Sequence, residues 1–168
     1  MSYNPQSGFE GQNETDLIQL PNGMLAAFMR TGIHGYVDQH GRENLDQPVL
    51  ISWSTDAGRN WSEPQRIRVG ARLIAGIYPR ALRTQNGVLA LLRCRPDGSV
   101  VFSPTGRGSS WAKEVVYYRP GQGPQHAGMQ DMALIGPNQI LVADVIRKDG
   151  WRVEGVPLTV KVRKADTR

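Results

Sequence analysis

Three stretches of the chain share one arrangement of apolar and polar positions. Each has an apolar run, a tight turn that contains an asparagine, and a second apolar run. The stretches are Asp16–Arg30, Arg80–Arg95 and Asp131–Arg147. Asn-Gly pairs in such turns favour the positive backbone φ angles that hairpins need. The pattern therefore predicts three β-hairpins.

The hairpins form a repeat of variable length. Their turn asparagines are Asn22, Asn86 and Asn138, so the intervals are 64 residues (22 to 86) and 52 residues (86 to 138). A polar stretch at Gly32–Gln47 lengthens the first interval. A period of about 40 to 50 residues is typical of β-propeller blades. We therefore predict successive blades, although an ordinary β-sandwich stays open.

Further strands are expected after each hairpin, and four strands make one propeller blade. The expected strands are Pro48–Thr55, Ser62–Val69, Gly98–Ser103, Lys113–Tyr118 and Gly155–Arg163. Apolar runs such as Leu25–Met29 and Val88–Leu92 predict strands that are buried on both faces. The predicted fold class is all-β, a partial six-bladed propeller of four-stranded antiparallel blades. One partial domain would span 1–168, with blade-like units at about 14–70, 71–120 and 121–168.

Composition narrows the classes of function. The 19 Gly and 11 Pro favour short strands joined by turns over helices. The formal net charge of +5 suits an anionic partner, such as a carboxylate sugar, a phosphate or nucleic acid. The arginines are spread among apolar strand residues and form no basic run. We therefore expect an anionic sugar or glycan as the partner, and no nucleic acid.

Cysteine and histidine give no sign of a metal or other cofactor. A single cysteine, Cys94, excludes an internal disulfide, and we expect it to be a small buried apolar residue. His34, His40 and His126 have no zinc-ligand spacing.

The sequence also lacks the patterns of membrane insertion and export. No apolar run approaches the roughly 20 residues of a membrane span, and the first residues have no signal-peptide pattern. We therefore expect a soluble chain with no membrane partner. The compartment of a longer parent protein, secreted or periplasmic, stays open.

A turn motif carries the first family resemblance. Residues Ser54–Trp61 read STDAGRNW, which resembles the Asp box, S-x-D-x-G-x-x-W, of sialidases and related propellers. In such a turn Asp56 accepts backbone hydrogen bonds, Gly58 adopts a positive φ, and Trp61 packs its ring under the turn. A degenerate copy at Ser103–Trp111 lacks the aspartate. The Asp box is a structural device, so it indicates fold more than activity.

The resemblance continues in a charged pair on the first hairpin. In sialidases a glutamate opens the first strand of a blade and an arginine closes the second, as Glu14 and Arg30 do here. Both are symmetric about Asn22, so a simple hairpin would place them opposite each other, about 5 Å apart. The resemblance implies that the glutamate polarises a tyrosine nucleophile and the arginine helps to clamp a sugar carboxylate. An ordinary cross-strand ion pair explains the same pattern.

Other candidate site residues stand at the starts of predicted strands, which line the binding mouth of a propeller. Arg80 resembles another arginine of the sialidase clamp, whereas Arg83 is expected to be solvated or packed against its neighbours. Asp16 and Gln130 are candidates for substrate binding. Asp131 is a second candidate catalytic carboxylate beside Glu14, suited to binding sugar hydroxyls or to a different hydrolytic chemistry.

The sequence departs from the family where the nucleophile belongs. Met129 stands at the position expected for the tyrosine, and Tyr117 and Tyr118 are expected to pack on the strand that ends the preceding blade. The resemblance covers Glu14 to Arg163, which corresponds to the second half of the family's domain. The first clamp arginine and the acid/base aspartate would belong to earlier blades. We therefore expect an incomplete active site.

Several functions stay open. The resemblance implies a sialidase-like glycan-processing protein, an exo-acting glycoside hydrolase. The alternative is a non-catalytic glycan-binding or scaffolding propeller, and a third hypothesis is a purely structural oligomerisation unit. Residues His34, Tyr36, Asp38 and His40 lie in a loop that either caps the sugar or is a solvated insertion.

Three blades would leave two apolar faces uncovered. We expect either a missing N-terminal half of a longer propeller or a homodimer that closes a ring.

Overall fold

The structure is a computed structural model that describes residues 9–33, 48–94, 97–119, 125–147 and 150–161. These residues form thirteen strands and no helix, which confirms the predicted all-β class. Within the described ranges there is accordingly no helix that is long and apolar enough to cross a membrane. The expected capping loop with His34 and His40 lies outside the described residues, as do Tyr36 and Asp38.

Three antiparallel sheets contain most of the strands. The first sheet has the order β1 (Phe9–Gln19), β2 (Leu25–Ile33), β3 (Val49–Ser54) and β4 (Gln65–Arg66). The second sheet comprises β7 (Ile77–Arg83), β8 (Leu89–Cys94), β9 (Gly98–Ser103) and β10 (Lys113–Tyr118). The third sheet comprises β11 (Gln125–Gly136), β12 (Gln139–Arg147) and β13 (Trp151–Thr159). A two-stranded ribbon of β5 (Arg68–Val69) and β6 (Arg72–Leu73) joins the first two sheets along the chain.

Most predicted strands are confirmed, and two predictions need correction. The predicted strand Ser62–Val69 is wrong as a single strand, because Ile67 separates β4 from β5 and buries its side chain in the core. The predicted strand Gly155–Arg163 begins too late, because β13 pairs with β12 from Trp151 onward. In the described residues the third sheet has three strands, whereas four were expected.

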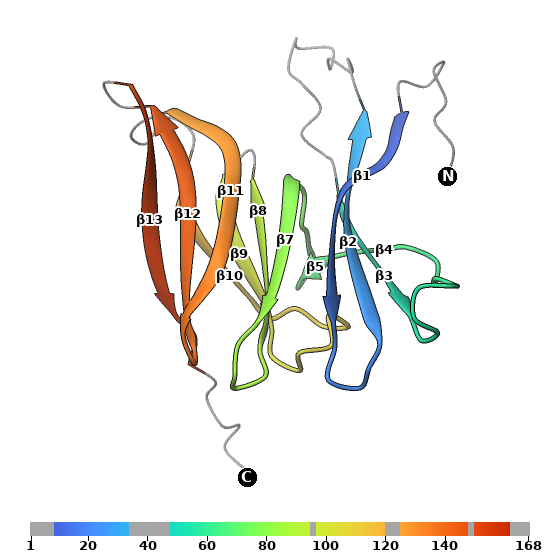
Figure 1. Ribbon diagram of the computed structural model, residues 1–168. Coiled ribbons are helices and arrows are strands. Elements are labelled where there is room, and N and C mark those ends of the chain that lie inside the picture. Colours follow the sequence, from blue (N-terminus) through green and yellow to red (C-terminus); the bar gives the residue numbers. More distant parts are fainter. Residues whose placement is uncertain (1–8, 34–47, 95–96, 120–124, 148–149, 162–168) are drawn as a thin grey trace.

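The three predicted hairpins lie in separate sheets. Strand β7 contacts both β1 and β11, and Figure 1 shows these three strands side by side and running in the same direction. Each is the first strand of its hairpin and the innermost strand of its sheet. The sheets therefore stack face to face around the inner strands, as blades do.

Strand β8 lies between two hydrophobic cores, and all six of its residues are buried. Leu89 and Leu91 face the first sheet, where Phe28 and Trp111 meet edge to face with their ring centroids 6.0 Å apart. Ala90 and Leu92 point the opposite way and pack against the third sheet. This confirms the double burial that the apolar run predicted. Cys94, at the end of the strand, is also buried as predicted.

The Ser54–Trp61 turn has the hydrogen bonds that its sequence predicts. The Asp56 carboxylate accepts from the backbone N–H of Asn60 at 2.8 Å, and Ser54 Oγ accepts from the N–H of Gly58 at 2.9 Å. The backbone and side-chain hydrogen bonds from Asn60 hold the pKa of Asp56 below its usual value. Gly58 has a φ of 87°, which a residue with a Cβ rarely adopts.

The Ser103–Trp111 turn repeats this geometry without the aspartate. Ser103 Oγ accepts from the N–H of Gly108 at 3.2 Å, and the Trp111 indole donates to the Gly108 carbonyl at 2.9 Å. Trp61 makes the equivalent indole bond to Gly58. However, Trp61 is 40% exposed, whereas Trp111 is buried against Phe28. Trp61 thus packs under its turn as expected, close to Gly58, but it stays at the surface, whereas Trp111 enters the core shared by the first two sheets.

The two tryptophans provide a matched test of this difference. We expect Trp111→Ala to lower the free energy of unfolding by about 3–5 kcal/mol, because it empties space in the core between two sheets. Trp61→Ala should cost clearly less, because much of its ring already contacts water. Denaturant titration of both variants measures the difference, and equal losses would contradict the assignment.

Candidate functional site

The inner strands share an irregularity near their starts. Register shifts interrupt the pairing at 13–16 in β1, at 77–80 in β7 and at 126–130 in β11. In the first two, Glu14 and Tyr78 both have a φ of 49°. Such a conformation costs a residue other than glycine about 1–3 kcal/mol and is enriched at functional sites. Bulges of this kind re-aim side chains beside active sites.

Tyr78 is the residue that sequence reasoning missed. It lies eight residues before the turn asparagine Asn86, as Glu14 lies eight residues before Asn22. The two strained residues therefore occupy equivalent places in neighbouring sheets. Comparing these offsets along the chain would have singled out Tyr78 without a structure.

Glu14 joins the first sheet to the second. Its Oε1 atom lies 2.7 Å from a terminal nitrogen of Arg30, and its Oε2 atom accepts a hydrogen bond from the backbone N–H of Tyr78 at 2.9 Å. The predicted backbone register is wrong, because the bulge places Asn13 opposite Arg30. The predicted side-chain contact nevertheless forms. Glu14 is thus both the partner of an arginine and a bridge between two inner strands.

Asp16 makes a second bridge between these strands. Its carboxylate accepts a hydrogen bond from the backbone N–H of Ala81 at 2.6 Å. At the next boundary, Arg80 Nε lies 4.0 Å from Asp131 Oδ1. The Asp131 side chain is 76% exposed and that of Arg80 is 37% exposed. Of the predicted site residues, Arg80 and Asp131 are therefore the most open to a ligand.

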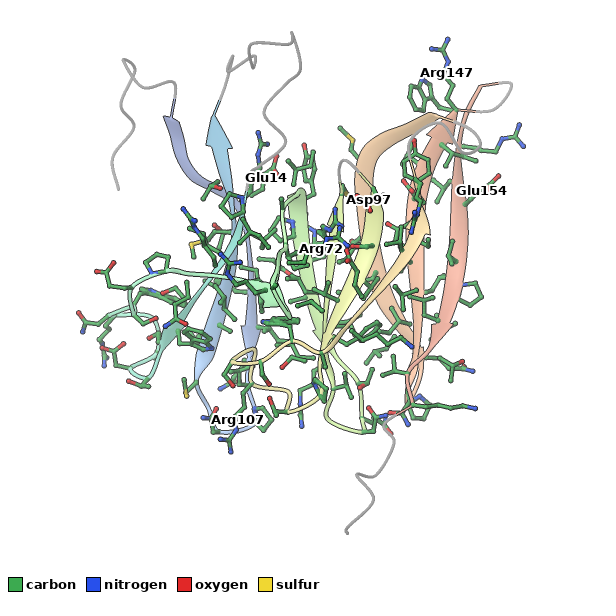
Figure 2. The ribbon with its side chains drawn as sticks, turned by 180° about the vertical axis from the view of Figure 1, so that it is seen from behind. Glu14, Arg72, Asp97, Arg107, Arg147 and Glu154 are labelled. Atoms are coloured by element: carbon green, nitrogen blue, oxygen red, sulfur yellow. The ribbon has the colours of Figure 1, made fainter. Side chains whose placement is uncertain are left out.

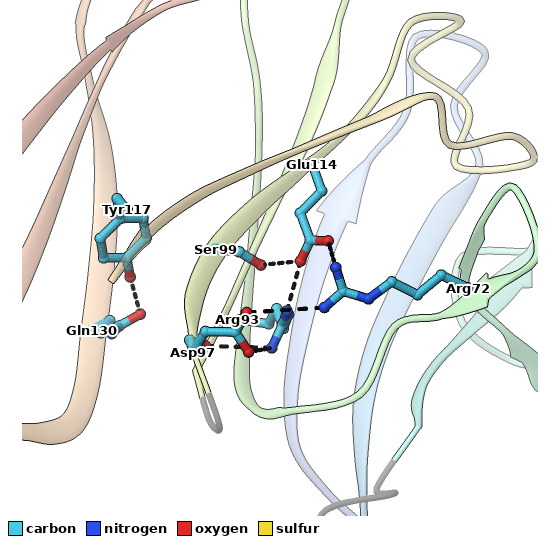
Figure 3. Close-up of polar contacts among 7 residues, drawn as sticks. All are labelled: Arg72, Arg93, Asp97, Ser99, Glu114, Tyr117 and Gln130. Carbon is cyan, nitrogen blue, oxygen red and sulfur yellow. Dashed lines mark hydrogen bonds and ion pairs between the residues drawn. The ribbon is translucent and has the colours of Figure 1, made fainter. Parts of the chain in front are cut away.

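Gln130 is not at an open mouth as its sequence position predicted. Only 8% of it is exposed, because the amide oxygen accepts a hydrogen bond from the Tyr117 hydroxyl and the amide nitrogen donates to Asp144 at 3.0 Å. Figure 3 shows the contact with Tyr117. Burial raises the pKa of Tyr117. Both residues therefore pack the boundary between the second and third sheets, as expected for Tyr117. Met129, beside Gln130, is 59% exposed and carries no nucleophilic group.

A second polar cluster joins β6 to the second sheet, and its Arg93 lies in β8 opposite the 77–80 bulge of β7. Arg93 is 1% exposed, and its guanidinium contacts Glu114 at 2.6 Å and Asp97 at 3.3 Å (Figure 3). The half-exposed Arg72 of β6 forms ion pairs with the same two carboxylates. This cluster ties four segments of the chain together.

The pKa of Glu114 reflects this environment. Burial by itself would raise it, but the hydrogen bond from Ser99 and the charges of Arg93 and Arg72 hold it below its usual value of 4.5. Glu114 is therefore an ionised structural carboxylate, unlike a general acid, whose pKa would be raised.

The candidate site and the hairpin turns lie at opposite ends of the strands. Figure 2 shows Glu14 and Asp97 toward one end of the molecule and Arg107 at the other. Within the described ranges, no group of three or more His, Cys, Asp or Glu residues is arranged to hold a metal ion. The end of the strands opposite the hairpin turns thus carries Glu14 and Tyr78, each at the bulge of its own strand.

Comparisons with known proteins relate the fold, and not the sequence, to other molecules. No protein-family model matches the chain, and neither does any curated protein. A protein of unknown function from Dyadobacter fermentans superposes with a TM-score of 0.67 and 18% identity, covering 90% of this chain and 39% of that chain. A GH62 hydrolase solved in complex with xylotriose superposes with a TM-score of 0.55 and 13% identity, covering 94% of this chain and 49% of that chain.

These likenesses concern fold alone. The GH62 hydrolase is a β-propeller, so the stacked antiparallel sheets of this chain are arranged like those of a propeller protein. The chain spans less than half the length of each of these two structures.

Arg93 and Arg72 contact the same carboxylates from different environments, which allows a direct test. Arg93→Met should lower the free energy of unfolding by about 3–5 kcal/mol, because it removes the buried partner of Glu114. Arg72→Met should cost less than about 1 kcal/mol, because the Arg72 side chain is 55% exposed and solvent screens its charge. Urea titrations of the two variants measure both values. A larger loss of unfolding free energy for Arg72→Met than for Arg93→Met would contradict this prediction from burial.

Glu114 should also make stability depend on pH. Since its pKa is lower in the folded chain than the usual 4.5, ionised Glu114 favours folding. This contribution is complete well above pH 4.5 and is lost as the pH falls through the pKa of the folded state. Glu114→Gln should therefore lose less stability than the wild type between pH 6 and pH 3. Unfolding titrations at several pH values measure this difference. An equal fall in stability for the wild type and Glu114→Gln over this range would show that Glu114 does not cause the pH dependence.

Proposed function

We propose that this chain forms three successive blades of a sialidase-like, six-bladed propeller and binds an anionic sugar where β1, β7 and β11 begin. The proposed ligand class is a sialic acid or a uronic acid, held by its carboxylate. Arg30 and Arg80 are the residues proposed to bind that group, since a guanidinium pairs with a carboxylate through two parallel hydrogen bonds.

The observation that carries the proposal is the pair of equivalent strained bulges at Glu14 and Tyr78. Strain of this kind persists where surrounding contacts hold a side chain in a functional orientation. Here the Glu14 carboxylate supplies those contacts, because it binds both Arg30 and the backbone of Tyr78. Tyr78 adds an aromatic ring with a hydroxyl group, a combination suited to a ligand with apolar and polar faces.

Arg80 is the better candidate for direct contact with the ligand. Arg30 is already paired with Glu14 at 2.7 Å, whereas Arg80 is more exposed and lies 4.0 Å from Asp131. A sugar carboxylate would compete with Asp131 for Arg80 at modest cost, because exposed ion pairs contribute little free energy. Arg30 would then provide a second positive charge whose orientation is set by Glu14.

Glycoside hydrolysis is the second candidate function. It is favoured by the propeller fold shared with a GH62 hydrolase and by the exposed Asp131 carboxylate. Two observations weigh against it for this chain. Glu14 uses both carboxylate oxygens in contacts within the protein, and Met129 stands where the sialidase resemblance requires a tyrosine. Binding without turnover is therefore the function that the geometry supports better.

Calorimetric titration with N-acetylneuraminic acid, glucuronic acid and xylotriose tests the binding proposal. We expect one of the two acids to bind, and Arg80→Ala to weaken that binding at least about tenfold through loss of the carboxylate contact. Arg107→Ala is the matched control, because Arg107 is exposed at the opposite end of the strands and should leave the affinity unchanged. Absence of binding by both acids, or equal affinity after Arg80→Ala, would refute the proposal.

Chromogenic glycosides of the same acids separate binding from hydrolysis. The wild-type chain should bind the free acid and release no aglycone. Release that depends on Asp131 or Glu14 would favour the hydrolytic candidate instead.

A further inference from the structure

Among the residues that the structure describes, two sheet faces are left uncovered, one at each end of the stack. On the first sheet, the face turned away from the second sheet has an apolar groove of about 460 Å³, whose lining includes Leu17, Met29 and Trp61. On the third sheet, the face turned away from β8 carries Val145 and the opposite residue Val153, which is 69% exposed. Exposed apolar surfaces of this kind typically mark interaction sites.

The first and second sheets already pack on each other, and the contacts between them show which groups pair when two such faces meet. There, the Asp16 carboxylate of β1 accepts a hydrogen bond from the Ala81 N–H of β7. Inner strands of different sheets form no ladder with each other, so their inward N–H groups need such acceptors. The apolar residues of the two sheets then form the shared core. One side of the boundary thus provides a carboxylate and the other a backbone donor.

The two open faces carry the same two groups, a carboxylate on one face and an inward backbone N–H on the other. Asp131 stands in β11 where Asp16 stands in β1, since each lies three residues before a matching pair near the hairpin end, Leu134–Ile140 and Gln19–Leu25. Leu17 stands in β1 where Ala81 stands in β7, since each lies two residues before the matching pair near the hairpin end, Gln19–Leu25 and Arg83–Leu89. The third sheet therefore ends the stack with a carboxylate, and the first sheet begins it with an inward backbone donor.

Asp131 has an oxygen available for this contact. Its Oδ1 atom accepts the Met132 N–H at 2.8 Å and faces Arg80. In the described part of the chain, its Oδ2 atom forms no hydrogen bond, and the side chain is largely exposed.

We propose that a second copy of this chain covers both faces in a closed head-to-tail dimer. The third sheet of each copy would pack on the first sheet of the other, with Asp131 accepting a hydrogen bond from the Leu17 N–H of the partner. A two-fold axis through the centre makes the two interfaces identical and leaves neither face open. The inference does not depend on sugar binding.

Sedimentation equilibrium over a range of concentrations tests the dimer. The wild-type chain should have twice the monomer mass of 18.6 kDa. Leu17→Asp and Val153→Asp should each yield monomers, because each introduces a charge into both interfaces of the closed dimer. Both positions are exposed in the single chain, so thermal unfolding should show that each variant still folds. Arg107→Ala, at an exposed turn residue, should remain dimeric.

Mixing the two variants tests the head-to-tail geometry. A Leu17→Asp copy retains an intact third sheet and a Val153→Asp copy retains an intact first sheet, so the mixture should recover dimers through one unaltered interface. A dimer formed through two copies of the same face would contain only one of the two positions, so one of the single variants would remain dimeric, and that result would also overturn the head-to-tail proposal. A wild-type chain that is monomeric at every concentration, a wild-type open polymer, or dimers that persist in both single variants would overturn the proposal.

Discussion

The structure depends on how neighbouring inner strands satisfy their inward backbone N–H groups, which form no β-ladder hydrogen bonds. Strands β1, β7 and β11 belong to different sheets, yet they lie side by side around the centre of the stack. Their inward N–H groups therefore need acceptors from side chains. Glu14 and Asp16 supply two of these acceptors to β7, at the N–H groups of Tyr78 and Ala81. The carboxylates set the spacing of the sheets, and the apolar cores on both sides of β8 then hold it.

The same contacts prepare the candidate site. The Glu14 carboxylate reaches across to the next sheet from a bulge in its own strand, and Glu14 and Tyr78 both adopt positive φ angles. Opposite the bulge in β7, the buried ion pair of Arg93 with Glu114 links β8 to β10 within the second sheet. Structural and candidate binding roles are thus joined in one region. Arg30, one of the arginines proposed to bind a ligand, is held by Glu14, which also connects the first two sheets.

Local pattern was sufficient to predict much of this fold. Asn-containing turns between apolar runs predicted three hairpins, and the hairpins formed because short-range turn preference and strand alternation act within a few residues of each other. The double burial of β8 followed from its continuous apolar run. The pairing of Glu14 with Arg30 was also predicted from symmetry about Asn22, although the bulge shifted the backbone register by one position. Tyr78 was overlooked although the sequence contained its offset.

The sequence by itself determined the strands, the turns and the charged residues at the strand starts, because each depends on local preference and spacing. Only the tertiary structure decided which polar groups remain available. Gln130 forms its hydrogen bonds between two sheets and is buried. Trp111 rather than Trp61 enters the core, and the Asp131 side chain stays exposed to solvent. These outcomes depend on which sheet lies against which face, and that arrangement is set by contacts between residues far apart in the chain. The pattern of neighbouring residues in the sequence does not specify such contacts.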